Sequence, residues 1–296
     1  MSSPSETGAR PVIVTPALLR DWPLPPTASS KYGRGQVLVV GGARSTPGAA
    51  MLAALASLRA GAGRLSLAVA ESVAVALAVA IPESGVVGLP ETATGSVRGE
   101  GADRLAGSLA SSDAVLVGPG LDDADEAAAL LRGLAPHVGE DTSVVLDAYA
   151  LGVLPRLDDV VERLSGRLVL TPNTGEAERL LGRDIDSADL PDAVAQIARR
   201  YGAVVSCYGE VAAPDGRRWQ MSTGYAGLAT SGSGDVMAGA LSGLLARGAD
   251  LAQATCWGTH LHAAAGDRLA ARIGPTGFLA RELLDELPVV LAELDT

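Results

Sequence analysis

A short glycine-rich run with one carboxylate is the part of the sequence best suited to chemistry. Gly232-Ser233-Gly234-Asp235 precedes an apolar stretch typical of a helix. Small residues let the backbone approach an anion, and the first amides of a helix point toward it. Asp235 could take a proton from a substrate hydroxyl while these amides stabilise a transferring phosphoryl group. The run therefore predicts phosphoryl transfer, although it also suits an ordinary turn in which Asp235 favours the helix dipole.

Asn173 and Glu176 form a second candidate pair, three residues apart where a predicted strand meets a helix. Such a pair can order the water shell of a magnesium ion beside phosphates, with Glu176 toward the metal. The same pair can cap the helix, with Asn173 or Thr174 as the N-cap and Glu176 in the first turn. The sequence leaves both interpretations open, and both can hold at once.

Two further glycine-rich turns could line a ligand. The run from Gly41-Gly42 to Pro47-Gly48 opens an alanine-rich helix, but it lacks the spacing of dinucleotide-binding and Walker-type loops. Gly118-Pro119-Gly120 is a rigid turn with bare backbone, which suits a flat ligand and equally suits a plain structural turn. His260 and His262 lie two apart on a predicted helix and face different directions, so they make a poor metal pair.

These turns follow predicted strands, so the fold must bring them together. Continuous apolar runs alternating with helical stretches are typical of a parallel sheet covered on both faces. Because ligands bind outside the carboxyl ends of such strands, we expect the turns to converge. The chain after Gly234 is almost wholly helical. The predicted strands are Gln36–Val40, Leu65–Ala70, Ala114–Val117, Ser143–Leu146, Leu168–Leu170 and Ala203–Ser206, and predicted helices include Ala49–Ala60, Ala124–Leu134 and Leu190–Arg200.

Charge and composition exclude several classes of partner. The 23 lysines and arginines face 34 acidic residues, a net charge of −11, so nucleic acid and anionic membranes are poor partners. Cys207 and Cys256 lie in apolar surroundings and are expected to be buried free thiols. The longest apolar run, Val73 to Ile81, is too short to span a bilayer, and the N-terminus lacks a signal-peptide pattern. We therefore expect a cytoplasmic protein.

The length of 296 residues suits one large α/β domain. Residues 1–30 are rich in Ser, Pro and Thr, and we expect them to form a loosely ordered arm with a short helix from Pro16 to Asp21. Residues 31–296 are expected to form a single catalytic domain.

Taken in order, the motifs resemble the ADP-dependent NAD(P)H-hydrate dehydratases of the ribokinase-like superfamily. The resemblance covers about Leu24 to Leu287. It implies an α/β three-layer sandwich, with a mostly parallel central sheet and helices on both faces. The matching runs, besides those above, are Lys31, Leu58-Arg59-Ala60-Gly61-Ala62-Gly63, Asp147-Ala148, Ala150-Leu151, Thr171-Pro172 and Gly175-Glu176.

The resemblance implies a repair enzyme that removes water from the S-epimer of hydrated NADH or NADPH. ADP or ATP, with Mg2+ at Glu176, phosphorylates the hydroxyl of the hydrated ring, Asp235 acts as base, and AMP, phosphate and NAD(P)H are the products. Relatives form tetramers, so a homotetramer is expected. The implied nucleotide-binding residues are Tyr208, Gly209, Gly232, Ser233 and Gly234, and the implied substrate-binding residues are Gly42, Ala49, Gly120, Asn173 and Asp235.

The sequence departs from the family pattern near the nucleotide. Where the family has Leu-Lys-Gly, the chain has Cys207-Tyr208-Gly209, so the lysine is missing, and the loop that follows is about three residues shorter. Asn173-Thr174 replaces His-Pro, Tyr149 replaces an Asp, and Ser30 replaces a His. Two alternatives to an active dehydratase follow. The first is a small-molecule alcohol kinase of the same superfamily, and the second is a non-catalytic nucleotide-binding relative, suggested by Tyr208.

Overall fold

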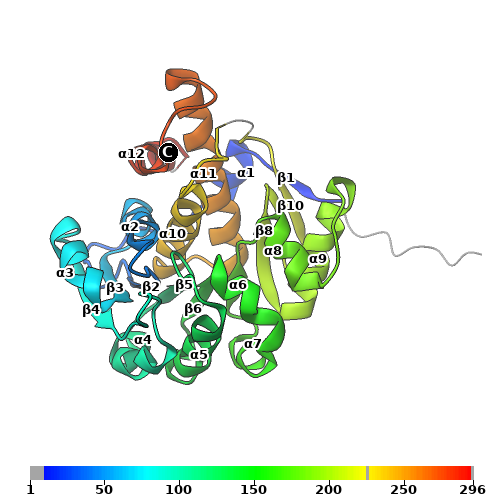
Figure 1. Cartoon of the computed structure of the whole chain (residues 1–296). Coiled ribbons are helices and arrows are strands. Elements are labelled where there is room, and N and C mark those ends of the chain that lie inside the picture. The colour runs from blue at the N-terminus through cyan, green and yellow to red at the C-terminus, as the bar shows by residue number, and fades with distance from the viewer. Residues whose placement is uncertain (1–9, 225–226, 295–296) are drawn as a thin grey trace, which may run out of the picture.

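The computed structural model describes residues 10–224 and 227–294 and centres on one sheet of ten strands (Figure 1). The strand order across the sheet is β1-β10-β9-β8-β7-β6-β5-β2-β3-β4. Only β9 runs antiparallel to its neighbours, and every other pair is parallel. The strands are β1 (Val12–Val14), β2 (Gln36–Val40), β3 (Arg64–Ala70), β4 (Ser84–Leu89), β5 (Ala114–Val117), β6 (Ser143–Leu146), β7 (Leu168–Leu170), β8 (Ala203–Cys207), β9 (Glu210–Ala212) and β10 (Arg218–Met221).

Helices cover both faces of the sheet, which confirms the predicted three-layer sandwich. Alternate residues of β2 enter opposite cores: Val37 and Val39 pack with α2, α10, α11 and α12, whereas Leu38 and Val40 pack with α5 to α9. The helices are α1 (Pro16–Asp21), α2 (Pro47–Arg59), α3 (Glu71–Ala80), α4 (Ala106–Ala110), α5 (Ala124–Leu134), α6 (Tyr149–Val153), α7 (Asp158–Leu164), α8 (Thr174–Leu181), α9 (Leu190–Tyr201), α10 (Ser233–Ala246), α11 (Leu251–Ile273) and α12 (Ala280–Leu294).

The six predicted strands are confirmed as β2, β3 and β5 to β8, each within one residue at either end. Strands β1, β4, β9 and β10 were not predicted from the sequence. Strand β4 contains Gly85 and Gly88, which break the apolar run, and β9 and β10 carry polar side chains such as Glu210 and Gln220. The missed strands lie at or near the two edges of the sheet, where a continuous apolar pattern is not required.

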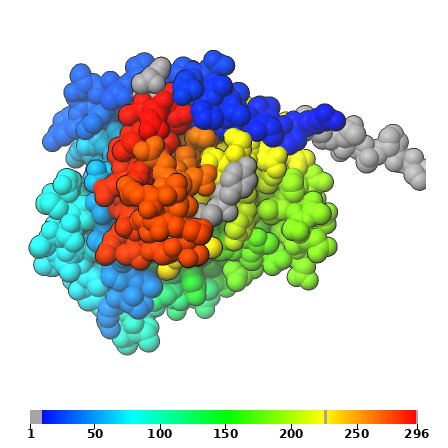
Figure 2. Space-filling model, turned by 90° about the horizontal axis from the view of Figure 1, so that it is seen from above, coloured from blue at the N-terminus to red at the C-terminus, as the bar shows by residue number. Residues whose placement is uncertain are grey.

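Part of the N-terminal segment, expected to be loosely ordered, has regular structure. Strand β1 pairs in parallel with β10, and α1 spans the predicted helix from Pro16 to Asp21. Val14 and Leu19 are fully buried, and the indole nitrogen of Trp257 donates a hydrogen bond of 2.9 Å to the Trp22 carbonyl. Figure 2 shows this segment, in blue, beside the orange and red C-terminal helices. Apolar side chains of residues 12–22 thus fasten the segment to the core, and residues 1–9 lie outside the described residues.

Helix α10 is held against α2 at backbone distance. A Cβ added to Gly239 would lie 2.1 Å from the Ala53 carbonyl oxygen, and one added to Gly243 would lie 2.3 Å from that of Ser57. Only glycine fits at these two positions, so the close contact fixes where the N-terminus of α10 lies. No helix of the described ranges is long and apolar enough to cross a membrane.

Candidate active site

The chain changes direction across the sheet between β2 and β5. These strands are neighbours, but the chain continues from β2 to β3 on one side and from β5 to β6 on the other. Loops that diverge at such a point leave a crevice at the carboxyl edge, where α/β proteins bind ligands. Here the Gly42 amide donates to the Pro119 carbonyl and the Ala43 amide to the Gly120 carbonyl, each at 2.8 Å. Both predicted glycine turns therefore meet at this point.

Three predicted substrate-binding residues come together there. A Cβ added to Gly120 would lie 3.2 Å from the Ala49 Cβ and 3.2 Å from the Gly42 Cα. It would also lie 2.4 Å from the Thr46 carbonyl oxygen, and Gly120 has a φ of +75°. Both the steric contact and the backbone conformation therefore disfavour a side chain at this position. Gly42, Gly120 and the Ala49 methyl group thus form a surface without large side chains, called the wall below, against which a flat ring could pack.

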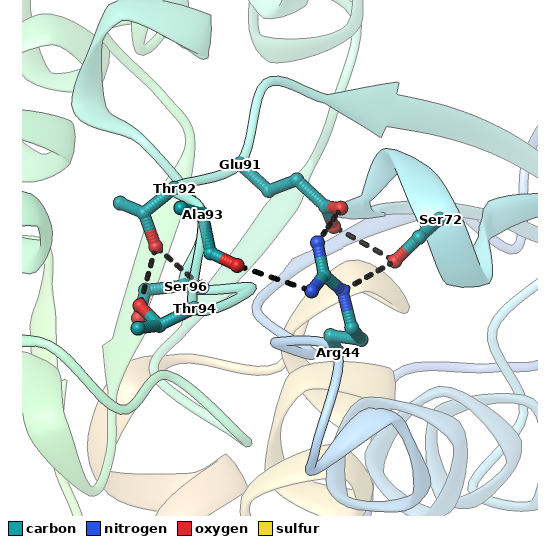
Figure 3. Close-up of polar contacts among 7 residues, drawn as sticks. All are labelled: Arg44, Ser72, Glu91, Thr92, Ala93, Thr94 and Ser96. Atoms are coloured by element: carbon teal, nitrogen blue, oxygen red, sulfur yellow. Dashed lines mark hydrogen bonds and ion pairs between the residues drawn. The ribbon is translucent and has the colours of Figure 1, made fainter.

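Arg44 fastens the Gly42 loop to the neighbouring loop after β4 (Figure 3). Its guanidinium contacts the Glu91 carboxylate, the Ser72 hydroxyl at 3.4 Å and the Ala93 carbonyl at 3.3 Å. Its backbone amide donates to the Gly95 carbonyl at 2.9 Å. The Arg44 guanidinium also lowers the pKa of Glu91, so that carboxylate stays ionised. Since Arg44 lies two residues from Gly42, this cluster restrains the wall described above.

The predicted anion-binding run lies at the N-terminus of α10, which contacts β5 and β6. Gly232 precedes the helix with a φ of +89°, and a Cβ on it would lie 2.6 Å from the Leu52 Cδ1 of α2. Gly234 is exposed, Asp235 is half-buried, and the Ser233 side chain is buried. The first amides of a helix have no intrahelical partner, so those of Gly234 and Asp235 suit an anion.

Three carboxylates influence one another at this edge. Burial raises the pKa of Asp235 to about 7, and the charges of Asp147 and Glu176 add to the rise. Burial likewise raises the pKa of Asp147 to about 6, against hydrogen bonds from the Thr171 hydroxyl at 2.8 Å and the Ala148 amide. It raises the pKa of Glu176 to about 7. A carboxylate that titrates near neutral pH is suited to general-base catalysis, which favours Asp235 for that role.

Asp147 belongs to one of the runs that match the family, but no role in the site was predicted for it from the sequence. It follows β6 directly and thus lies at the same edge as the other turns, which is the signal that could have found it. Its backbone is also close-packed, because a Cβ on Gly118 would lie 1.8 Å from the Asp147 carbonyl oxygen. The next residue, Ala148, has a φ of +50°, an unusual conformation for a residue with a side chain.

Asn173 and Glu176 form a capping box at the start of α8. The Glu176 amide donates to Asn173 Oδ1 and the Asn173 amide to Glu176 Oε2, each at 2.9 Å. This confirms the capping interpretation of the pair, with Asn173 as the N-cap. The box also fixes the Glu176 carboxylate at the carboxyl edge, facing the charges of Asp147 and Asp235.

Tyr208 and Gly209 form a two-residue hairpin turn between β8 and β9. Their φ values are +47° and +84°, the pattern of a type I′ turn, and Cys207 pairs with Glu210 across it. This two-residue turn lies where the sequence is shorter than the family pattern. Tyr208 is 74% exposed, so its ring lies at the surface of the carboxyl edge of the sheet. Type I′ turns favour Asn or Gly at this position, so tyrosine strains the backbone here.

The two histidines of α11 differ in their surroundings. His262 is buried and hydrogen-bonds through Nε2 to the Ser233 hydroxyl at 2.8 Å, whereas His260 Nδ1 is buried without a partner. Among residues 10–224 and 227–294, no three His, Cys, Asp or Glu side chains are placed to hold one metal ion. The two histidines were considered from the sequence only as metal ligands, so the hydrogen bond from His262 to the anion-binding run was not predicted.

Comparison with known sequences identifies the family. The sequence model of the NAD(P)H-hydrate dehydratases matches residues 37–289. The ADP-dependent (S)-NAD(P)H-hydrate dehydratase of Xanthomonas campestris is 44% identical over 97% of this chain and 99% of its own length. That of Neisseria meningitidis is 36% identical over 86% of this chain and 84% of its own. A bifunctional NAD(P)H-hydrate repair enzyme of Moorella thermoacetica is 39% identical over 88% of this chain but only 50% of its own length.

Solved structures agree with this assignment. The ADP/ATP-dependent NAD(P)H-hydrate dehydratase of Bacillus subtilis, co-crystallised with ATP and Mg2+, has a TM-score of 0.79 and 26% identity, covering 98% of this chain and 100% of its own. Phosphofructokinase-2 of Escherichia coli, at 14% identity and a TM-score of 0.59, covers 87% of this chain and 99% of its own and shares the fold alone. The chain belongs to the NAD(P)H-hydrate dehydratase family.

Proposed function

We propose that this chain is a dehydratase that uses ADP or ATP to restore NADH or NADPH from the S-epimer of its hydrate. One observation carries the proposal: a carboxylate with a near-neutral pKa, Asp235, lies at an anion-binding helix N-terminus. The glycine turns after β2 and β5, which are hydrogen-bonded to each other, lie at the same edge. Close relatives with this activity match over nearly the whole chain, which supports the same assignment.

The reaction uses Asp235 first. Its carboxylate accepts the proton of the hydroxyl on the hydrated ring, and the hydroxyl oxygen bonds to the terminal phosphorus of the nucleotide. The backbone amides of the Gly232–Gly234 run stabilise the phosphoryl group in transfer. The ring nitrogen's lone pair then expels phosphate, the carbon–oxygen bond breaks, and loss of a ring proton restores the dihydronicotinamide. With ADP, the products are AMP, phosphate and NAD(P)H.

The hydrated nicotinamide is assigned to the paired glycine turns after β2 and β5. Gly42 and Gly120 present no side chain there, and the Ala49 methyl group lies beside Gly120, so we assign the flat face of the ring to this position. Asn173, exposed at the carboxyl end of β7, has its Oδ1 engaged in capping, which leaves the amide nitrogen as its group for a substrate. Asp235 is assigned to the hydroxyl itself.

Magnesium fits the donor set at this edge. Mg2+ is usually held by one or two carboxylates together with substrate phosphates and several waters. Glu176 has one carboxylate oxygen in the capping box, and its raised pKa reflects burial and the charge of Asp147, which a divalent cation would offset. When bound, Mg2+ supplies charge neutralisation of the phosphates. Glu176 is therefore assigned to hold and orient metal-bound water.

Glu176→Gln should weaken the dependence on magnesium while leaving the fold intact. Glutamine can keep the capping box, because either residue serves at that position. The variant therefore removes the carboxylate charge alone, and we expect about 10-fold more Mg2+ to be needed for half-maximal activity. Titrating magnesium and measuring the melting temperature checks this. Glu178→Gln, in the same helix, is the matched control. An unchanged metal requirement with a lower melting temperature would make Glu176 a capping residue only.

The adenine nucleotide is assigned to the hairpin side of the edge, next to Tyr208 and Gly209. The exposed ring of Tyr208 offers a face for the base, a contact worth about 0.5–1.5 kcal/mol. The strained turn supports this role, since such strain collects at functional positions. Ser233 has its hydroxyl bound to His262 and its backbone amide bound to the Thr230 carbonyl at 3.1 Å. The amides of Gly232 and Gly234 on either side of it are therefore the groups assigned to the phosphate.

Tyr208→Lys should tighten ADP binding by about 5- to 10-fold, because a charged hydrogen bond contributes about 1.5–3 kcal/mol, more than a stacked ring. Tyr208→Asn is the control: it fits the type I′ turn, so it should raise the melting temperature while weakening ADP binding. Calorimetric titration of ADP, ATP and AMP checks both. Tight wild-type binding with no gain in Tyr208→Lys and no loss in Tyr208→Asn would remove Tyr208 from the nucleotide site.

A homotetramer is proposed to bury an apolar face of α3. Val75 and Val79 are each 78% exposed, and Ala76, Ala78 and Ala80 beside them are exposed as well. Helix α3 packs next to β4, the edge strand of the sheet, so a second copy can approach this face. Light scattering should give four times the mass of the chain, and Val75→Lys with Val79→Lys should reduce it. A monomeric wild type would contradict the assembly.

We assign the enzyme to the cytoplasm. Cys207 and Cys256 are both free and buried, as in proteins of reducing compartments. Cell fractionation with an antibody to the chain tests this assignment.

Hydrated NADH offered with ADP or ATP tests the function and separates it from both alternatives. We expect loss of the S-epimer alone, with NADH formed in equal amount to phosphate. A phosphorylated alcohol that accumulates from other substrates, with no NADH formed, would favour a kinase. Nucleotide binding without any turnover would favour a non-catalytic protein.

A further inference from the structure

A hydrogen bond joins the anion-binding run to a helix distant in sequence. The Ser233 hydroxyl and His262 Nε2 lie 2.8 Å apart, and both side chains are buried. Ser233 is the first residue of α10, and His262 lies in the middle of α11. The Ser233 side chain therefore points into the protein, and the backbone amides on either side of it are left to face an anion.

The run needs such an anchor because of its composition. Gly232 and Gly234 flank Ser233, and glycine loses more conformational freedom on ordering than any other residue. A Cβ added to Gly234 would meet nothing within 4 Å, so no packing restrains that side. Preorganised donors stabilise a transition state only if they are fixed before the reaction. The Ser233 hydroxyl is the side-chain group that can fix the middle of the run.

His262 is suited to hold the hydroxyl without adding charge. Burial lowers the pKa of His262 to about 4, against a hydrogen bond with Ser233, so the imidazole is neutral at neutral pH. A neutral ring can either accept from or donate to a hydroxyl, according to its tautomer. It thus restrains Ser233 by geometry rather than by attracting phosphate.

Helix α11 holds the preceding segment as well. Asp267 Oδ2 accepts a hydrogen bond of 2.9 Å from the Gly224 amide and a second from the Thr223 hydroxyl. One helix therefore contacts the chain both before and at the anion-binding run, through side chains one to two turns apart.

We infer that His262 is a positioning residue for phosphoryl transfer, which holds Ser233 and thereby aligns the Gly232–Gly234 amides with the phosphate. This inference rests on the proposed function for the identity of the phosphate. Because hydrogen exchange can be measured on the protein alone, the effect of the hydrogen bond on the order of the run can be separated from its effect on nucleotide binding.

The test compares two disruptive variants with matched controls. Ser233→Ala and His262→Leu each remove the hydrogen bond, and His262→Gln keeps an amide group at the place of Nε2. Ser242→Ala makes the same change in the interior of α10, where the hydroxyl donates to the Ala238 carbonyl of its own helix. His260→Leu makes the same change two residues away on α11. Two measurements are made on each: hydrogen exchange of the free protein at the Ser233 and Val236 amides, which donate to the Thr230 and Gly232 carbonyls, and ADP affinity by calorimetry.

We expect faster exchange at both amides, and ADP binding about 3- to 10-fold weaker, in Ser233→Ala and His262→Leu. The double variant should be no worse than either single one, and His262→Gln and both controls should behave as the wild type. Unchanged exchange in folded Ser233→Ala and His262→Leu, or additive effects in the double variant, would overturn the inference. Faster exchange together with a wild type that does not bind ADP would support the positioning role and contradict the proposed function instead.

Discussion

Asp235→Asn is expected to lower turnover by about 10²- to 10⁴-fold, the contribution of a positioned general base. ADP should bind the variant at least as tightly as the wild type, because a carboxylate beside the Gly232–Gly234 amides opposes the charge of phosphate. Turnover of hydrated NADH and calorimetric titration of ADP measure the two effects. Wild-type turnover in the variant would show that another group removes the proton.

The same variant should be more stable than the wild type at alkaline pH. The pKa of Asp235 rises in the folded state from 3.8 to about 7, so the folded protein holds this proton more tightly than the unfolded chain does. The stability that the proton confers is present below about pH 4 and is lost as the pH rises through about 7. Asparagine does not ionise, so the Asp235→Asn variant does not lose this stability as the pH rises. Melting temperatures should therefore differ at pH 8 and converge near pH 4, and a variant less stable at pH 8 would contradict the buried-carboxylate account.

Ala49→Leu is expected to raise the KM for hydrated NADH by about 5- to 150-fold. The Ala49 Cβ faces Gly120, and the extra atoms would occupy the space assigned to the nicotinamide ring, equivalent to overpacking by about 1–3 kcal/mol. ADP binding should be unchanged, since the nucleotide is assigned to the opposite side of the edge. Steady-state kinetics with calorimetry measures both.

Gly48→Leu is the matched control for Ala49→Leu. Gly48 is the preceding residue of α2, it is exposed, and a Cβ there would meet nothing within 4 Å. Leucine at this position should leave the KM within about twofold, because an exposed substitution away from the wall has little to disturb. Equal effects of the two variants would mean that the start of α2, rather than the wall, had been perturbed.

Much of the fold could be predicted because burial on both faces leaves a plain signal. Strands such as β2 and β5 are continuous apolar runs, and their ends could be placed to within one residue. The turns after these strands contain glycine where the chain needs positive φ or close contact, as at Gly42 and Gly120. The rule that such turns share one edge then sufficed to bring the crevice residues together.

What could not be predicted depends on contacts between distant segments. Asp147 follows a predicted strand in the sequence, but the sequence alone does not show that its side chain is buried or that burial raises its pKa to about 6. His262 acquires a role only through Ser233, which lies 29 positions earlier in the chain. The Tyr208-Gly209 turn could be recognised as a shortened loop, but its type I′ geometry requires the pairing of β8 with β9.

The oxygen isotope content of the released phosphate tests the central claim most directly. The S-hydrate of NADH, prepared in water enriched in oxygen-18, carries the heavy atom in the hydroxyl that the nucleotide is proposed to phosphorylate. Wild-type enzyme with ADP and Mg2+ in ordinary water should then release NADH and phosphate, with one heavy oxygen in each phosphate, as measured by mass spectrometry. Unlabelled phosphate, with the heavy oxygen recovered in water, would show that nucleotide hydrolysis and dehydration are separate events. It would contradict phosphoryl transfer from the nucleotide to the substrate hydroxyl with Asp235 as the base.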